Sequence, residues 1–397
     1  MNIPVSTCAP VQAPAQELRT PLCDLLGCRY PIVQTAMGWV AGSSLVVATT
    51  NAGGFGFLAG ATIAANEIEG EIVRIRELTG DKPFGLNFHM FQPNAQQLLD
   101  LAVKHKLRAV SYGRGPDKKV IGRLRDAGIV CMPTVGALKH AQKAIEMGAN
   151  AITIQGGEGG GHTGSVPTTV LLPQVVDAVD VPVVAAGGFY DGRGLLAALA
   201  FGAQGIAMGT RFLMTSDSGV PDVTLQRYLA TRDAEKIQIS YLVDGMPQRM
   251  IPNEYLAMLE KASPLKRLRI AVNLALQFKA QTGMTTQHAM GVMWKGLRDD
   301  PGSAAQTVMA ANAPMLLQRS MTDGKPAEGV MSAGQVAALI GKLDSCEQVI
   351  SGIVAQACER RAALNAMTAA PAPVAASAPT AAAAPPASAA LQGAHAA

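Results

Sequence analysis

Short apolar runs alternate with helix-length segments from Arg19 to about Phe212. The runs are rich in Val, Ile and Ala, and the segments between them, such as LKHAQKAIEMGA and GRGLLAALAFGA, carry apolar residues at helical spacing and end in Gly. Repeats of this kind are typical of βα units that build a parallel sheet. The eight predicted strands are 31–36, 54–59, 84–88, 109–113, 129–135, 151–157, 182–188 and 205–212.

Eight strands at this spacing predict an α/β fold, a (β/α)8 TIM barrel, with an open doubly wound sheet as the alternative. The positions of the glycines favour the barrel, because NAGG, QGGEGGGHTG, AAGG and MGTRF all lie at or beside strand ends, which converge on one rim. After Phe212 the chain becomes Met- and Ala-rich with helical spacing and no further clear strand, which predicts a helical cap after strand eight. SAGQVAALIGKL and CEQVISGIVAQACERRAALNAM are expected to form a final helix pair on the barrel.

The same pattern predicts how the chain is divided. Its last segment is almost only Ala, Pro and Ser, a composition that cannot bury a core. The expected parts are a flexible N-terminus (1–18), the barrel (19–222), the helical cap (223–314), C-terminal helices packed on the barrel (315–367) and a disordered tail (368–397).

Composition excludes several classes of protein. With 397 residues, 49% of them hydrophobic, the chain can bury a large core. A net charge of +4, without a basic block interleaved with aromatics, argues against nucleic acid as a partner. The first twenty residues lack a signal peptide, and the folded body has no apolar run long enough to span a membrane. Six scattered cysteines, without CxxC pairs or metal-like spacing, predict no metal site and a reducing cytoplasm.

Two glycine-containing segments follow the last two predicted strands. VPVVAAGGFYDGRG precedes a helix that begins near Gly192, where backbone N–H groups and the helix N-terminus can approach an anion closely. IAMGTRF repeats the arrangement after strand eight and adds a Thr hydroxyl. One such segment alone would favour a simple tight turn, but two in succession predict the phosphate site that barrels often build there. No GxxxxGK[ST] motif is present, so a P-loop is excluded.

Polar residues at other strand ends predict the rest of a cofactor site. Gln34, Asn87 and Gln155 lie near the C-terminal ends of strands one, three and six, where their amides can bind the edge of a heteroaromatic ring. Met37 can pack on the face of that ring. Taken singly, each amide would more often be a loop cap.

His162 is the candidate catalytic residue, because it lies in the flexible strand-end loop QGGEGGGHTG and an imidazole titrates near neutral pH. Glu158 in the same loop has three open roles: a base, a group that orients His162, or a cap of the next helix. His89, just past strand three, is a second candidate at the mouth. His105, His140 and His395 are interpreted as solvated, and His288 is not assigned a place.

The motifs QTAMGWVAG, NAGGFGFLAG, FGLNF, QGGEGGGHTG, AAGGFYDGRGLLAALAFGAQGIAMGTRF and SAGQV together resemble the nitronate monooxygenase (2-nitropropane dioxygenase-like) family of FMN-dependent barrel enzymes. The resemblance covers about Arg19 to Met367. Within the family, QTAMGWVAG, QGGEGGGHTG, SDSGVPD, VDGMP and AANAPMLL are most similar to a flavin oxidoreductase subgroup of bacterial steroid degradation that acts on a CoA-linked indane propionate. MGWVAG and the Pro133-Thr134 region depart from the usual family pattern, so substrate preference is not carried over with the cofactor.

The resemblance implies a flavoprotein that binds FMN, with the phosphate on the glycines after strands seven and eight. It implies that His162 is the acid/base or substrate-orienting group. NAD(P)H is a candidate electron donor, and a second copy of the chain is a candidate partner in a homodimer. The predicted cofactor-binding residues are Gln34, Thr35, Ala36, Met37, Asn87, Gln155, Gly160, Gly161, Gly187, Gly188, Gly209 and Thr210.

The expected activity is therefore that of an FMN-dependent oxidoreductase of the nitronate monooxygenase type, acting on a small molecule at a barrel mouth. Alternatives within the family are an oxidoreductase for an enone or CoA thioester of steroid ring degradation, and an NAD(P)H:quinone or enoyl reductase. From another class, a non-redox phosphosugar isomerase or aldolase would use the same phosphate site. A non-enzymatic binding module is disfavoured by the histidine at the rim.

Overall fold

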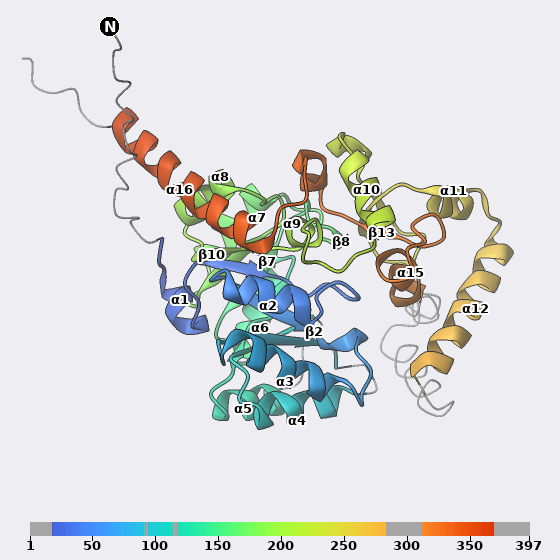
Figure 1. Cartoon of the computed structure of the whole chain (residues 1–397), viewed down its shortest axis with the longest axis horizontal. Helices are drawn as coiled ribbons and strands as arrows, with labels where there is room; N and C mark the ends of the chain where they lie inside the picture. The colour runs from blue at the N-terminus through green and yellow to red at the C-terminus, as the bar shows by residue number, and fades with distance from the viewer. Residues whose placement is uncertain (1–17, 91, 93, 114–117, 283–311, 369–397) are drawn as a thin grey trace, which may run out of the picture.

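The computed structural model describes residues 18–90, 92, 94–113, 118–282 and 312–368. It forms a barrel with a second group of elements, including α11, α12 and α15, gathered on one side (Figure 1). The predicted flexible N-terminus and tail lie outside the described residues, apart from their boundary residues Leu18 and Thr368, as does His288.

Nine parallel strands form the barrel wall in the order β5-β4-β3-β2-β1-β10-β9-β7-β6. The two ends of this path, β5 and β6, are successive pieces of the predicted fifth strand, separated by Met132 and Pro133. Pro133 has no N–H to donate, but its carbonyl accepts from Thr153 N. The split strand thus joins both neighbours and closes the barrel, which confirms the (β/α)8 fold. The strands are β1 (Ile32–Gln34), β2 (Phe55–Ala59), β3 (Gly85–Phe88), β4 (Ala109–Tyr112), β5 (Val130–Cys131), β6 (Thr134–Val135), β7 (Ile152–Gln155), β9 (Val183–Ala186) and β10 (Gly205–Met208).

Helices cover the outside of the barrel (Figure 1). Most of them begin at the mouth, because each follows the C-terminal end of a strand, whereas α1 packs against the barrel interior with Leu22 and Leu26 and plugs the opposite end. These helices are α1 (Pro21–Leu26), α2 (Ser43–Asn51), η1 (Gly60–Thr62), α3 (Ile68–Thr79), α4 (Ala95–Lys104), α5 (Lys118–Asp126), α6 (Leu138–Glu146), α7 (Thr168–Val176), α8 (Gly192–Ala200) and α9 (Thr210–Leu213).

Side chains of the wall alternate between the barrel interior and the layer beneath the helices. Val33, Phe57 and Val184 belong to the interior cluster. Their neighbours Ile32 and Leu58 belong to clusters that pack against the surrounding helices. This alternation decides which strand-end residues look into the mouth.

The segment after β10 corrects the prediction that it contains no further strand. β11 (Gln238–Ser240), β12 (Gln248–Ile251) and β13 (Met331–Ser332) form an antiparallel sheet that β8 (Gly161–His162) joins by pairing with β12. These strands are two to four residues long, and their paired residues lie up to 88 positions apart in the chain, so no local alternation marks them. The other elements here are α10 (Asp222–Ala230), η2 (Ala234–Lys236), α11 (Glu254–Lys261), α12 (Pro264–Thr282) and α15 (Asn312–Met321).

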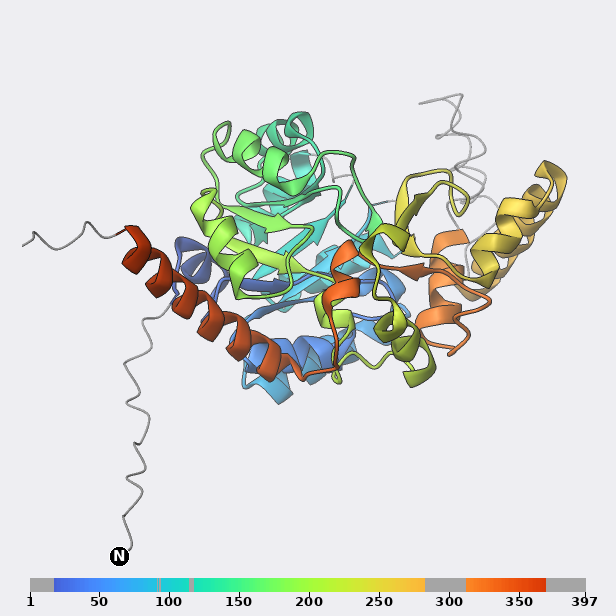
Figure 2. The same cartoon turned by 90° about the horizontal axis from the view of Figure 1, so that it is seen from above.

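Only the second of the two predicted C-terminal helices is an α-helix. SAGQVAALIGKL forms the 3-10 helix η4 (Gln335–Leu339), and Ala333 and Gly334 before it pack closely against Gly160. The second helix, α16 (Cys346–Thr368), is present as predicted and packs along α8 and α2 (Figure 2). Its contact with α8 is close: a Cβ at Gly192 would lie 2.4 Å from Ile353 O.

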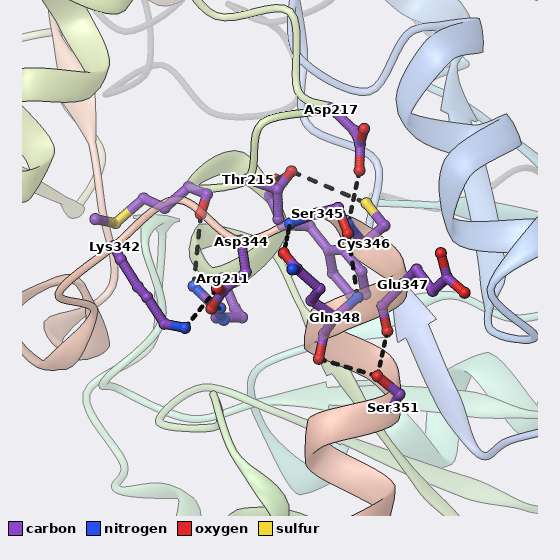
Figure 3. Close-up of polar contacts among 12 residues, drawn as sticks. Arg211, Thr215, Asp217, Lys342, Asp344, Ser345, Cys346, Glu347, Gln348 and Ser351 are labelled. Carbon is purple, nitrogen blue, oxygen red and sulfur yellow. Dashed lines mark hydrogen bonds and ion pairs between the residues drawn. The ribbon is translucent and has the colours of Figure 1, made fainter.

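A buried ion pair fastens the chain before α16 to the end of the barrel. Arg211 of α9 donates to Asp344 Oδ2 over 2.8 Å, and Lys342 reaches the other carboxylate oxygen over 2.9 Å (Figure 3). Burial lowers the pKa of the Arg211 guanidinium, although the Asp344 charge opposes this. The amide of Cys346 donates to Asp217, so both sides of the connection are tied down.

We expect Asp344→Ala to lower the free energy of unfolding by about 3 kcal/mol, because it leaves Arg211 buried and uncompensated. Glu254→Ala is the matched control, since it breaks the exposed Arg227–Glu254 ion pair, worth about 0–1 kcal/mol. Chemical denaturation of both variants measures the difference. Equal losses would show that the buried pair contributes no more than the exposed one.

Candidate active site

The alternation of the wall places two of the predicted amides in the mouth. Asn87 and Gln155 lie an even number of residues after interior-facing positions of β3 and β7, so their side chains face the same way as those positions. Both are half-buried. Asn87 Nδ2 donates to Ser111 O over 3.0 Å. Gln155 Nε2 donates to His162 O over 2.9 Å, so it holds the glycine loop over the mouth.

Gln34 lies on the other face of the wall. It is fully buried, with Oε1 3.0 Å from where a Cβ on Gly56 would sit, beneath α2. Its Nε2 donates to Thr35 O and Phe57 O, whereas Oε1 has no partner among the described residues. The structure therefore separates Gln34 from the inward-facing pair.

The two predicted phosphate segments lie side by side. β9 and β10 pair with Ala186 opposite Ala207, so the residues that follow them emerge at neighbouring positions, about 4.8 Å apart. Gly187 and Gly188 have φ values of 93° and 82°, a conformation that side chains disfavour. The amides of Gly187, Gly188 and Gly209 donate no hydrogen bond to any described residue. This rim thus presents backbone donors suited to an anion.

The N-terminus of α8 does not contribute donors, contrary to the sequence-based expectation. Asp191 caps the helix by accepting from the amides of Arg193 and Gly194, and Gln356 of α16 accepts from Gly192 N over 2.7 Å. Those amides are therefore occupied by the protein itself. Gly192 is small because α16 crosses it, which the sequence of the turn alone does not indicate.

Residues after β1 flank Gly209. A Cβ at Gly209 would lie 3.1 Å from Thr35 Oγ1 and 3.4 Å from Met37 Sδ. Ala36 and Met37 are half-buried at the top of the core. Thr210 Oγ1 accepts from Gly334 N over 2.9 Å, so this hydroxyl fastens the segment before η4 and retains its own proton for donation.

The glycine loop between β7 and α7 is compact, and Gly156 and Gly160 have no room for side chains. A Cβ at Gly156 would lie 2.0 Å from Thr168 Oγ1, and one at Gly160 would lie 2.5 Å from the backbone of Ala333 and Gly334. Gln335 N donates to Glu158 O on the same side. Gly161 has a φ of 68° and begins β8. The loop is therefore clamped between the barrel and the 332–335 segment.

Glu158 caps a helix, one of its three open roles. Both of its carboxylate oxygens accept from Thr168 N, the first amide of α7, and Oε2 also accepts from Thr168 Oγ1 over 2.7 Å. A carboxylate at this position also opposes the positive end of the helix dipole. The cap holds the loop against α7, while the imidazole of His162 is bound elsewhere.

The partner of His162 is Asp244. Pairing of β8 with β12 places His162 opposite Gln248, and His162 Nε2 donates to Asp244 Oδ2 over 2.7 Å. Gln248 Nε2 donates to the same oxygen, also over 2.7 Å. Asp244 is 5% exposed and His162 is 49% exposed at the side chain. The arrangement leaves Nδ1 of His162 without a hydrogen bond to any described residue.

Burial acts to raise the pKa of Asp244, but the hydrogen bond and charge of His162 outweigh it, so the pKa lies below its ordinary value. A carboxylate with a lowered pKa stabilises the fold above its unfolded pKa and loses that contribution as the pH falls through the folded value. Asp244 is therefore a charged acceptor across the neutral range. It can hold the imidazole in one tautomer and stabilise its protonated form.

His162 and Gln155 line one end of a pocket of about 560 Å³ beside the mouth. His89 lies at another part of the rim, with Nδ1 3.5 Å from Gly113 O. Across the described ranges, no group of three or more His, Cys, Asp or Glu side chains is arranged to hold a metal ion. None of the described helices is both long and apolar enough to cross a bilayer.

Sequence reasoning missed Asp244, Gln248 and the 333–334 backbone as parts of this site. Their motifs, VDGMP and SAGQV, are conspicuous in the sequence, but nothing local gives them a role. An aspartate before a glycine in a turn is ordinarily a turn residue. Only the β8–β12 pairing brings Asp244 to His162.

Comparison with known proteins places this geometry in context. A family model described as nitronate monooxygenase matches residues 19–99 and 94–356. The (3aS,4S,5R,7aS)-5-hydroxy-7a-methyl-1-oxo-octahydro-1H-indene-4-carboxyl-CoA dehydrogenase of Rhodococcus jostii is 48% identical over 354 residues, covering 89% of this chain and 99% of the relative. The protein of the same name from Mycobacterium tuberculosis is 44% identical, covering 86% and 96%. A probable nitronate monooxygenase of Staphylococcus saprophyticus is 30% identical and covers 60% of this chain and 80% of its own.

Solved structures agree with the barrel. FabK from Thermotoga maritima superposes with a TM-score of 0.69 at 28% identity, over 88% of this chain and 99% of that one. A nitroalkane oxidase from Streptomyces ansochromogenes superposes with a TM-score of 0.65 at 29% identity, over 86% and 99%.

Asp244→Asn removes the charged acceptor of His162 while keeping its shape. We expect turnover to fall about 10- to 100-fold, the worth of one hydrogen bond to a charged group. Turnover at saturating substrate and retained flavin are measured together. Asp233→Asn, in the N-cap of η2, is the control and should keep full turnover. Unchanged turnover in Asp244→Asn would exclude a positioning role.

Gly160→Ala places a Cβ against the backbone of Ala333 and Gly334, and overpacking of this kind costs about 1–3 kcal/mol. We expect lower stability together with weaker flavin retention, because the glycine loop and the 332–335 segment must separate. Gly122→Ala in α5 is the control, since no atom lies within 4 Å of its Cβ. Thermal unfolding and flavin absorbance after gel filtration measure both effects, and wild-type behaviour of Gly160→Ala would contradict the clamp.

Proposed function

The chain belongs to the nitronate monooxygenase family and is a flavin oxidoreductase, and on that premise we propose that it is an FMN-dependent dehydrogenase of a CoA thioester from steroid ring degradation. The observation that carries the substrate proposal is near-full-length similarity, 48% identity over 99% of a relative whose name specifies an indene-carboxyl-CoA substrate. Similarity to the probable nitronate monooxygenase is lower and covers less of this chain.

The residues at the mouth fit FMN. The free amides of Gly187, Gly188 and Gly209 form a cradle for a monophosphate, and the hydroxyls of Thr35 and Thr210 stand beside it. Asn87 and Gln155 are the inward-facing amides available to a ring, whereas Gln34 would support the wall from behind. Ala36, Met37, Gly160 and Gly161 complete the proposed cofactor site.

When bound, FMN supplies the hydride acceptor. Dehydrogenation also releases a proton, and His162 Nδ1 is the nitrogen available to take it, because Nε2 is engaged with Asp244. Asp244 lowers the cost of the imidazolium that forms, since a charged acceptor favours the protonated ring. Gln155 keeps the loop that carries His162 in register with the mouth through its bond to His162 O.

We further propose a cytoplasmic protein, which the five free cysteines described are consistent with. NAD(P)H is the candidate redox partner, and a homodimer is the candidate assembly. Both stay predictions.

Purified protein should be yellow, and anaerobic mixing should bleach the flavin rapidly with a saturated bicyclic acyl-CoA. We expect His162→Gln to slow this bleaching by about 10²- to 10⁴-fold with the flavin spectrum unchanged. Nitronates, NADH and NADPH are mixed in parallel. Rapid bleaching by nitronates and none by the thioester would favour nitronate oxidation instead. A colourless protein that FMN does not reconstitute would support the non-redox barrel.

A further inference from the structure

The pocket that contains His162 continues away from the mouth, between α5 and α6. Its lining includes Gln155 and His162 together with His140 and Lys143 of α6. A volume of about 560 Å³ is within the range of ligand sites, and most of the exposed lining is apolar. This pocket, called the channel below, therefore contains both His162 and basic side chains of α6.

The split in the fifth strand shapes this channel. Pro133 and the three residues after it line the pocket where β5 ends and β6 begins. Gly136 and Gly164 face one another across the wall, and a Cβ at Gly164 would lie 3.1 Å from Gly136 O. The absence of side chains at these two positions keeps the wall thin beside His162.

The basic side chains that α6 contributes to this lining form no ion pair in the described ranges. The side chains of His140 and Lys143 form no hydrogen bond or ion pair with another residue in the described ranges, and both residues are exposed. Lys139 and the pair Lys118 and Lys119 of α5 add positive charge in the first turns of the two helices, where the structure has no acidic residue. Positive side chains there oppose the helix dipole, so they do not serve helix stability.

We propose that this channel holds the pantetheine arm of a CoA thioester and that Lys143, with His140 and Lys139, binds the phosphates of its nucleotide. The inference rests on the proposed function, because it requires the thioester end of the substrate to lie beside His162. A long arm between a reacting group and the phosphates of a nucleotide matches the kinds of residue that line the pocket: a proton acceptor, apolar side chains and basic side chains without an ion pair in the described ranges. Lysine is a common point-charge ligand of phosphate.

Charge reversal at Lys143 tests the subsite. For Lys143→Glu we expect KM for the acyl-CoA to rise about tenfold or more, the loss of one charged contact, with kcat unchanged. KM for the matching acyl-pantetheine, which lacks the nucleotide, should not change. Lys82→Glu is the control, since it makes the same charge change before β3, at the opposite end of the barrel.

Two results would overturn the subsite: an unchanged KM for the acyl-CoA in Lys143→Glu, or an equal rise for the acyl-pantetheine. Titration of CoA itself by calorimetry separates this failure from failure of the proposed function. If wild type turns over no thioester, the proposed function fails. The subsite then stands if CoA binds wild type and binds Lys143→Glu at least tenfold more weakly, and it falls if the two affinities are equal.

Discussion

The antiparallel pairing of β8 with β12 is the contact on which the candidate site depends. Through this pairing the glycine loop joins the small antiparallel sheet, with His162 opposite Gln248. From that single register, His162 meets Asp244, and Gly160 lies against the 333–334 backbone. A slip of one residue would turn His162 to the other face of the strand and break the bond to Asp244. Close packing explains several glycines of QGGEGGGHTG, Gly156 and Gly160 among them, and a positive φ explains Gly161.

Electrostatics divide the mouth into two regions. On the side of β9 and β10, neutral backbone amides with no partner in the described structure suit an anion that arrives with the cofactor. On the side of β8 and β12, a buried carboxylate is compensated by a half-exposed imidazole. Placing the negative charge of Asp244 behind His162 keeps it away from the phosphate rim, while Glu158 accepts hydrogen bonds at the first turn of α7. Each carboxylate thus has a local partner, and the mouth keeps donors for a phosphate.

The barrel was predictable because each of its strands carries its own signal. Apolar runs followed by helical segments identify all the strands of the wall, including the fifth, although the break at Pro133 divides it in two. The rim glycines were also predictable from the sequence, because Gly187 and Gly188 adopt positive φ values, which favour glycine at each position by itself. The small sheet was missed because strands of two to four residues leave no period. The α8 N-terminus was misjudged because Gln356, more than 160 residues later, occupies it.

The amino-acid sequence by itself determined the barrel and the position of His162 in a loop at a strand end, because local periodicity and backbone preference suffice for both. Tertiary structure alone decided which polar groups meet. Contacts between segments far apart in the chain place Asp244 beside His162 and pack Ala333 and Gly334 on the glycine loop. Such contacts also decide that the side chain of Gln34 points away from the mouth. Such contacts are selected by packing and pairing over the whole fold, and a short stretch of sequence carries no record of its distant partner.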